Sequence, residues 1–387
     1  MKINKIVCLM TSVRGGSKLL HYLLDSHPQV ICFPRTLKFN DFWNLIKSNN
    51  NSIESIADNF IKQYPRFFSG KIWGDYNILD KADRLGDRHN ETFSVDEDLF
   101  RFKFIEIFAN ETDINSKSVF INTHLAYHEA SGKKYLNNSI ILYHIHALKN
   151  IESLKFCVND FGLKKIKLIF MTKHPLQGMR SVIKWMDNIE TPIQHQPAQL
   201  FYYQHEIYLG LNEIKREIPD LNIKILLLES LIKDKHAFIN SLTQWLNIKW
   251  NDSLLKPTIH GKLWWGNAKV AKKGIDNNFD KFEPAGFLEK KDWELIKTTF
   301  PLRMIEYGYH NEDDEKIKIN FLIRFVLILL PTHYEHTLIV KYSKRLLFSF
   351  KSLTKKPITY LNNNIYFIVK WFYYYIKRIY LLHTLYK

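Results

Sequence analysis

The sequence predicts an α/β fold in which helices cover both faces of a central parallel sheet. Short, continuous apolar runs recur along the chain, as in Lys5–Met10 and Lys165–Thr172, and such runs are typical of strands buried on both faces. Segments with helical spacing separate these runs, and this alternation favours parallel strands joined by helices. Apolar residues make up 46% of the chain, which is enough to bury a large core.

The first elements follow one another closely. A strand over Lys5–Met10 leads through a glycine loop to a helix over Ser17–Ser26, which carries four leucines on one face and ends at Pro28. A second short strand is expected over Val30–Phe33. Residues 36–118 mix aromatic and charged side chains, and we expect helices and loops there.

The strand and helix rhythm returns after this region. The expected strands are Ser118–Thr123, Ile140–Ile145, Lys165–Thr172 and Asn222–Glu229. The expected helices are Asn150–Phe161, one that follows Pro175, Pro197–Glu217, Asp234–Leu246 and Phe287–Tyr307.

The net charge of +16 is concentrated near the C-terminus and favours an anionic partner. Residues 316–387 hold 13 Lys or Arg residues, 16 aromatic residues and one acidic residue, Glu335. We therefore divide the chain into a main domain over 1–310 and a basic, helical extension over 311–387. Such a tail can lie on an anionic membrane surface, bind nucleic acid, or pack against the main domain or another subunit. Specific nucleic-acid binding is not expected.

Three well-separated cysteines without a CxxC pair argue against a disulfide framework or a zinc site. No apolar stretch is long enough to suggest a membrane span. The expected location is the cytoplasm, or the inner face of the membrane if the tail binds lipid.

The loop after the first strand has the chemistry of an anion site. Arg14, Gly15, Gly16, Ser17 and Lys18 lie between the strand and the helix. The first N–H groups of a helix are unsatisfied and attract negative charge, and glycines let the backbone close on an oxyanion. A phosphate is the expected ligand. Neither the GxxxxGK[ST] pattern nor the GxGxxG pattern is present, which disfavours a nucleotide kinase.

The stretch SVRGGSKLLHYLLDSHPQV, residues Ser12–Val30, resembles the 5′-phosphosulfate loop of sulfotransferases that use 3′-phosphoadenylyl sulfate. The resemblance implies a P-loop-NTPase-like sulfotransferase fold. It also implies that the residues from Arg14 to Lys18 bind the 5′-phosphate and sulfate of the donor. Gly15 replaces a serine of the family pattern, and Lys18 replaces a serine or threonine.

Two later segments resemble the family's 3′-phosphate site. Lys173 follows a strand and Ser181 lies eight residues later, where the family has an arginine and a serine. Lysine cannot offer the bidentate geometry of arginine. The stretch AKKGIDNNF resembles the loop that closes over this phosphate, which implies roles for Lys272, Lys273 and Gly274. No metal is implied.

The implied reaction transfers a sulfuryl group to a hydroxyl or amine. Arg14, assisted by Lys18, would stabilise the leaving phosphate. His124, in the Thr-His-Leu context found in some family members, would be the general base. The lesser candidates for the base are His128, His144 and His146. The pair in His144–His146 has no carboxylate or cysteine nearby, which argues against a metal site.

The acceptor is the least defined part of the prediction. The resemblance implies a saccharide or a lipid-linked acceptor such as a glycolipid. Aromatic residues of the middle region could stack on sugar faces or form core; they are Phe42, Trp43, Tyr64, Phe67, Phe68, Trp73 and Tyr76. The alternative function is that of a non-catalytic protein of the same fold that binds a membrane or a polyanion.

Overall fold

The chain forms two compact units. The first comprises Met1–Thr11, Gly16–Thr172 and Ile214–Asp280, and the second comprises Ser12–Gly15, Lys173–Glu213 and Lys281–Lys387. The computed structural model describes residues 3, 5–11, 15–48, 52–73, 82–109, 111, 113–134, 136, 138–147, 150–174, 177–178, 181–182, 211–266, 336, 340, 368–369, 371–373 and 375–377. The predicted domain boundary at residue 310 lies outside these residues and stays a prediction.

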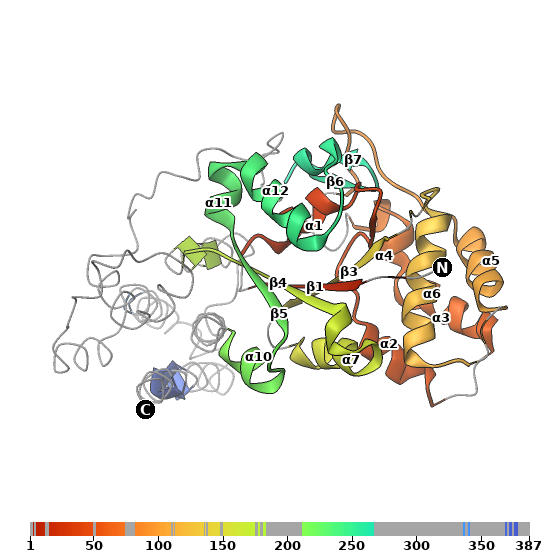
Figure 1. Ribbon diagram of the computed structural model, residues 1–387, viewed down its shortest axis with the longest axis horizontal. Helices are drawn as coiled ribbons and strands as arrows, with labels where there is room; N and C mark the ends of the chain where they lie inside the picture. Colours follow the sequence, from red (N-terminus) through yellow and green to blue (C-terminus); the bar gives the residue numbers. More distant parts are fainter. Residues whose placement is uncertain are drawn as a thin grey trace, which may run out of the picture. The chain divides into compact units, whose positions relative to one another are not determined.

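A five-stranded parallel sheet forms the centre of the first unit (Figure 1), as the sequence predicts. Its order is β2-β3-β1-β4-β5. The strands are β1 (Lys5–Thr11), β2 (Val30–Ile31), β3 (Ile140–Ala147), β4 (Ile166–Thr172) and β5 (Asn222–Leu227). Since all neighbours are parallel, the loops that follow the strands emerge at one edge of the sheet.

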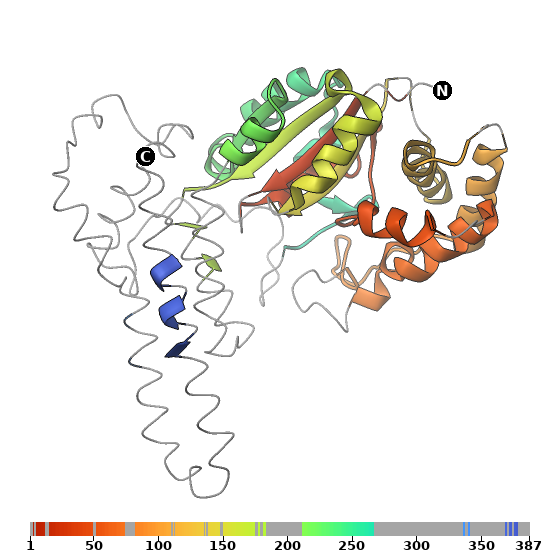
Figure 2. The same ribbon diagram turned by 90° about the horizontal axis from the view of Figure 1, so that it is seen from below.

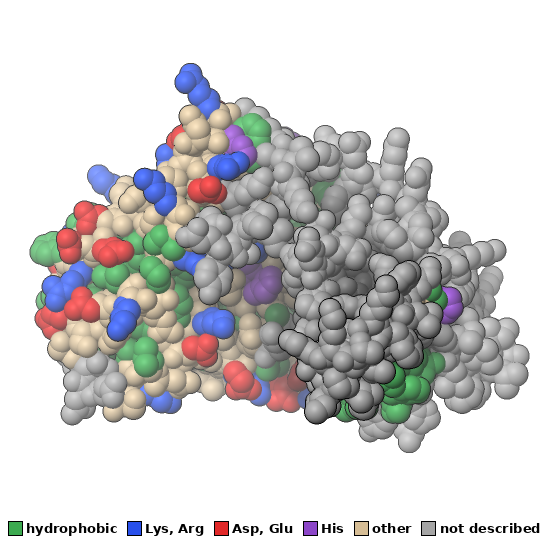
Figure 3. All heavy atoms as spheres, turned by 180° about the vertical axis from the view of Figure 1, so that it is seen from behind, with side chains coloured by type: hydrophobic (Ala, Val, Ile, Leu, Met, Phe, Trp, Pro, Cys, Tyr) green, Lys and Arg blue, Asp and Glu red, His purple; other side chains and the backbone are tan. Residues whose placement is uncertain are grey.

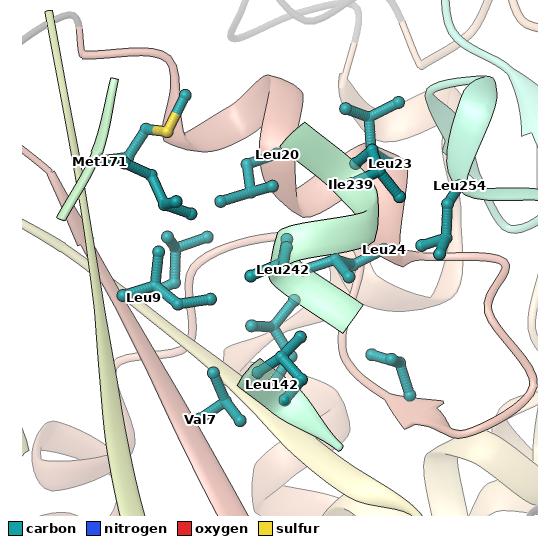
Figure 4. Packing of buried hydrophobic residues seen from close by; sticks show 14 of the residues in the cluster. Val7, Leu9, Leu20, Leu23, Leu24, Leu142, Met171, Ile239, Leu242 and Leu254 are labelled. Atoms are coloured by element: carbon teal, nitrogen blue, oxygen red, sulfur yellow. The ribbon is translucent and has the colours of Figure 1, made fainter. Parts of the chain in front are cut away.

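Aliphatic side chains fill one face of the sheet. The helices α1 (Ser17–Leu24), α11 (Leu228–Lys233) and α12 (Lys235–Leu246) cover this face. Figure 4 shows Val7 and Leu9 of β1 packed with leucines of α1 and α12. We call this set the aliphatic core. The helix α7 (Ile151–Phe161) covers the opposite face (Figure 2), where it packs on β3 and β4.

Aromatic rings pack the segment between β2 and β3. Its helices are α2 (Phe39–Ile46), α3 (Ile53–Gln63), α4 (Pro65–Phe68), α5 (Glu97–Phe108) and α6 (Ser116–Ala130). The buried phenylalanine and tyrosine rings here contact one another at centroid distances of 4.7 to 6.4 Å. We call this set the aromatic cluster; its members are Phe33, Phe39, Phe42, Phe60, Phe67, Phe68, Phe100, Phe104, Phe120 and Tyr127. The prediction of helices and loops over residues 36–118 is confirmed for the described residues.

The predicted strand over Ser118–Thr123 is wrong, because these residues form part of α6. The helix is buried on nearly all sides, from Val119 to Ala130, so its apolar residues show no one-sided pattern. A short apolar run buried on all sides looks the same in a strand and in a helix. Among the described residues, the sheet consequently has no strand between β2 and β3 in the sequence.

The remaining described elements are short. They are η1 (Lys71–Trp73), η3 (Leu163–Lys165), α10 (Asn212–Glu217), η5 (Asp252–Leu255), β6 (Thr258–Ile259) and β7 (Lys262–Leu263). The predicted helix at Phe287–Tyr307 and most of the one at Pro197–Glu217 lie outside the described residues. After Pro175, the described residues Gln177, Gly178, Ser181 and Val182 are helical, as predicted. In the part of the chain that is described, no helix is long and apolar enough to cross a membrane.

Candidate active site

The loop between β1 and α1 begins at the carboxyl end of the central strand. Thr11 closes β1 and donates from Oγ1 to the Met171 carbonyl of β4 at 2.7 Å. The helix α1 begins at Ser17, with Gly16 as its N-cap residue. Arg14 lies outside the described residues, as do Lys272, Lys273 and Gly274. The described part of the loop in the first unit is therefore Gly16, Ser17 and Lys18.

Gly16 is required by the backbone and by its surroundings. Its φ of 94° lies in the left-handed region that side chains disfavour. A Cβ at this position would lie 2.9 Å from Leu228 Cδ1, which is closer than real Cβ contacts. Both observations favour glycine where the chain turns into α1 beside α11.

The start of α1 carries no negative charge of its own. No side chain caps the helix at Gly16, and its first turn contains no acidic residue. Lys18 and the half-exposed backbone at Gly16 instead present positive potential. The first turn of α1 therefore offers no carboxylate of its own to compete with an external anion.

The other end of α1 is anchored by a buried carboxylate. Asp25 Oδ2 accepts hydrogen bonds from Thr258 Oγ1 and the Gly261 backbone N–H, both at 3.1 Å. Lys133 Nζ lies 3.5 Å from Asp25 Oδ1. These contacts tie the helix to the β6–β7 hairpin and fix the position of the loop.

Two buried histidines, His21 and His144, lie close to Ser17. His144 of β3 has its Nε2 3.2 Å from Ser17 Oγ, and its ring lies 5.1 Å from the ring of His21. A bulge in the pairing of β1 with β3 falls beside His144, since Leu9 pairs with His144 and Met10 with His146. Bulges re-aim side chains near functional sites.

Both histidines are held neutral. Burial lowers the pKa of His21 to about 4 and holds the pKa of His144 well below its usual value, with further lowering by His21, His146 and Lys18. His21 Nε2 donates to the Phe33 carbonyl at 2.8 Å, which leaves its Nδ1 unprotonated. A neutral His144 can donate to Ser17 Oγ, and Ser17 can then donate its own proton to an anion.

A pocket of about 500 Å³ opens beside this loop. Its residues come from α1, from the segment after β2, from the end of α3 with α4, and from β3. They are Lys18, Tyr22, Pro34, Arg35, Thr36, Lys38, Lys62, Gln63, Tyr64, Pro65, Arg66, Phe67 and His144. The volume suits a small-molecule ligand or one end of a longer one.

Of the predicted site residues, Lys18 and His144 line this pocket and Ser17 adjoins it through His144. His124 does not belong to its described lining. The His124 ring packs between Phe33 and Phe120 at 4.5 and 4.4 Å, and its Nδ1 donates to the Phe120 carbonyl at 2.7 Å. Burial lowers its pKa to about 3, against the opposing effect of that hydrogen bond. His124 is therefore neutral, with Nε2 as its unprotonated nitrogen.

Two of the predicted 3′-phosphate residues, Lys173 and Ser181, belong to the second unit, together with Gly15. Lys173 follows β4 directly and is 4% exposed. Ser181 is half-buried in the helical segment after it, where the Gly178 N–H donates to the His174 carbonyl at 2.9 Å. Within the described residues, no group of three or more His, Cys, Asp or Glu side chains is placed to hold a metal ion.

Sequence reasoning missed the cations of the pocket wall. Arg35 lies four residues after the end of β2, so it follows a parallel strand just as Lys173 follows β4. This position after a parallel strand could have indicated Arg35 as a candidate site residue. Lys62 and Arg66 reach the pocket only because α3 and α4 fold back onto it, and no local pattern indicates this.

Models of known protein families and curated protein sequences give no match to the chain. Among solved structures, it is similar to the sulfotransferase domain of the Synechococcus PCC 7002 olefin synthase, with 12% identity and a TM-score of 0.37 over 73% of this chain and 82% of that one. It is similar to the sulfotransferase domain from the curacin biosynthetic pathway, with 14% identity and a TM-score of 0.34 over 72% of this chain and 86% of that one. It is also similar to sulfotransferase STF9 from Mycobacterium avium, with 11% identity and a TM-score of 0.33 over 66% of this chain and 66% of that one. The likeness concerns the fold.

Proposed function

We propose that the chain transfers a sulfuryl group from 3′-phosphoadenylyl sulfate to a hydroxyl or amine of an acceptor. The observation that carries the proposal is the start of α1, where Gly16 turns the chain after the central strand and the first helical turn contains no acidic residue. The resemblance of Ser12–Val30 to the phosphosulfate loop identifies the anion. The pocket beside Lys18 supplies room for an acceptor.

The proposed donor contacts follow the sequence motifs. Arg14, Gly15, Gly16, Ser17 and Lys18 bind the 5′-phosphate and sulfate. The 3′-phosphate is bound by Lys173, Ser181, Lys272, Lys273 and Gly274. Sulfuryl transfer needs positive charge where the leaving phosphate gains charge, and Arg14 and Lys18 provide it. No metal has a role in this proposal.

The general base is the part of the proposal with two candidates. His124 is neutral and has the required unprotonated Nε2, but rings enclose it. His144 is also neutral and lines the pocket. Its place in the pocket wall favours His144, because a base must come within hydrogen-bond reach of the acceptor proton.

A thermal-shift titration tests the donor site. Adenosine 3′,5′-bisphosphate at 100 times its Kd should stabilise the protein by about 2.7 kcal/mol, and ATP should stabilise it less. Lys18→Gln should weaken the shift. The matched control is Lys47→Gln, since Lys47 is an exposed lysine at the end of α2 outside the pocket. A larger shift with ATP, or no shift with the bisphosphate, would contradict the proposal.

Turnover of the donor with a panel of hydroxyl acceptors tests the base. Replacement of the true base by alanine should lower kcat by about 100-fold or more and leave the affinity for the bisphosphate unchanged. The comparison of His144→Ala with His124→Ala therefore assigns the role. Equal turnover in both variants and the wild type would exclude both histidines.

A second candidate function is membrane binding by the tail, and one observation favours it. The described helical residues near the C-terminus expose Ile368, Val369, Phe372, Tyr373 and Ile376 by 45 to 61%. Their spacing places them on one helix face, and Lys377 lies 4.6 Å from the Tyr373 ring. Such a face suits an anionic lipid interface.

Flotation with vesicles of phosphatidylglycerol and phosphatidylcholine tests this candidate. The double variant Phe372→Glu with Ile376→Glu should lose binding if the face contacts lipid, whereas Trp250→Glu, an exposed aromatic site in the first unit, should not. Equal flotation of both variants and the wild type would assign the face to another role.

A further inference from the structure

The described lining of the pocket beside Lys18 is rich in positively charged side chains. Five of its thirteen described lining residues are Lys or Arg, and none of those thirteen is Asp or Glu. On the face seen in Figure 3, by contrast, Lys or Arg and Asp or Glu side chains are interspersed over the described surface. A concave site lined by one sign of charge concentrates ions of the opposite sign.

The cations come from separate elements that converge on one space. Arg35 and Lys38 follow β2, Lys62 ends α3, and Arg66 lies in α4. Lys38 has a nearby carboxylate in Asp41, but this pair is 3.9 Å apart and both side chains are well exposed. Exposed pairs of this kind contribute little, so the Lys38–Asp41 pair reduces the pocket's positive potential only slightly.

The position of these cations separates them from the donor site. In the strand order β2-β3-β1-β4-β5, the segment after β2 lies on one side of β1, and β4, which leads directly into Lys173, lies on the other. The proposed donor contacts lie after β1 and β4. The cations after β2 and in α3 and α4 follow neither of these strands, and they line the pocket beside Lys18 where the other reactant would bind.

We propose that the acceptor is itself an anion, with a phosphate, carboxylate or sulfate group near the hydroxyl or amine that receives the sulfuryl group. This inference rests on the proposed function and names the substrate class of the same site. Arg35 and Arg66 bind the acceptor's anionic group, since guanidinium groups match oxyanions bidentately. The stacked rings of Tyr64 and Phe67, 5.0 Å apart, form the apolar wall beside it.

The test measures anion binding apart from donor binding. Wild-type protein is titrated with inorganic phosphate, glucose 1-phosphate, glucuronate and glucose, with and without saturating adenosine 3′,5′-bisphosphate, and Tm is recorded. At least one of the three anions should raise Tm in both conditions, and glucose should not. The arms with a phosphate group and with a carboxylate group identify the preferred anion.

Matched variants locate the binding. The double variant Lys62→Gln with Arg66→Gln should weaken the anion's apparent affinity by tenfold or more. The control, Lys47→Gln with Lys71→Gln, removes the same charge from exposed positions outside the pocket and should retain it. No shift with any anion, an equal shift with glucose, or an equal loss in both double variants overturns the inference. A failure of the bisphosphate alone to bind overturns the proposed function instead, because the anion shift is measured without it.

Discussion

The first unit contains two neighbouring regions that are packed with different side chains. Aliphatic residues such as Leu9, Leu23 and Leu242 fill the face between the sheet and the helices α1 and α12. Rings such as Phe60 and Phe120 fill the segment from α2 to α6. The aliphatic core joins strands and helices with clear sequence patterns, whereas the aromatic cluster includes α6, which is buried on nearly all sides and shows no one-sided pattern.

The candidate site draws on both regions. Lys18 and Tyr22 reach the pocket from α1 on the aliphatic side, and Lys62, Tyr64 and Arg66 reach it from the aromatic side. The first region supplies Ser17 and Lys18 of the predicted anion loop, and the second supplies other lining residues of the pocket. A sequence motif can indicate the part of a candidate site that is contiguous in the chain. The other part depends on packing between distant segments, which no motif indicates. Variants in each region can test this division.

The largest expected effect is the loss of a ring from the aromatic cluster. Phe60 is fully buried and contacts Phe33, Phe42, Tyr64 and Phe100. Phe60→Ala should lower the free energy of unfolding by about 4 kcal/mol, because a large cavity replaces the ring. Urea unfolding of the variant and the wild type measures the change.

The matched variant in the aliphatic core is Leu242→Ala. Leu242 is also fully buried, and its truncation should lower the free energy of unfolding by about 3 kcal/mol. Phe60→Ala should also reduce anion binding in the pocket, because Phe60 supports Tyr64, while Leu242→Ala should leave it unchanged. A smaller loss of stability at Phe60 than at Leu242 would mean that the aromatic cluster contributes less than its burial indicates.

The next largest expected effect is a dependence of the free energy of unfolding on pH, and it arises from His124 in the aromatic region. Burial lowers the pKa of His124 to about 3 in the folded protein, against 6.5 for an ordinary histidine. Between these values the unfolded state binds more protons than the folded state, so stability falls as the pH falls below 6.5. At pH 5 the loss from this residue is about 2 kcal/mol relative to pH 7.5.

Urea unfolding at pH 7.5 and pH 5 measures this dependence. His124→Gln should reduce the difference between the two pH values, whatever its effect at either one. His236→Gln serves as the control, because His236 is exposed. A pH difference that is unchanged in His124→Gln would show that His124 does not titrate as its burial predicts.

A smaller effect is expected at the turn into α1, on the aliphatic side. Gly16→Ala should cost about 1 to 2 kcal/mol of stability because of its positive φ, and the clash with Leu228 adds to this. Gly132→Ala isolates the first contribution, since Gly132 has a φ of 71° with nothing within 4 Å of its Cβ position. Only Gly16→Ala should also weaken binding of the bisphosphate. Equal effects of the two variants on binding would remove Gly16 from the anion site.

The sequence predicts the five true strands of the sheet because each is a short apolar run next to a recognisable helix or loop. An anion loop over the contiguous residues from Arg14 to Lys18 stays a prediction. The sequence does not predict the pocket, because Arg35, Lys62 and His144 are distant in the sequence and meet only through packing. The error at Ser118–Thr123 has a related cause, since the burial of α6 on all sides hides its helical period.

A local signal for α6 was nevertheless present, and it leads to the smallest expected effect. Asn115 caps the helix: its side chain accepts from the Ser118 N–H at 2.9 Å, and Ser118 Oγ accepts from the Asn115 N–H at 3.0 Å. Asn115→Ala should cost about 1 kcal/mol, whereas Asn115→Asp should cost less because aspartate also caps well. Circular dichroism and urea unfolding measure both. If Asn115→Ala were neutral, packing within the aromatic cluster alone would hold the start of α6, and the cap would carry no weight in forming the helix.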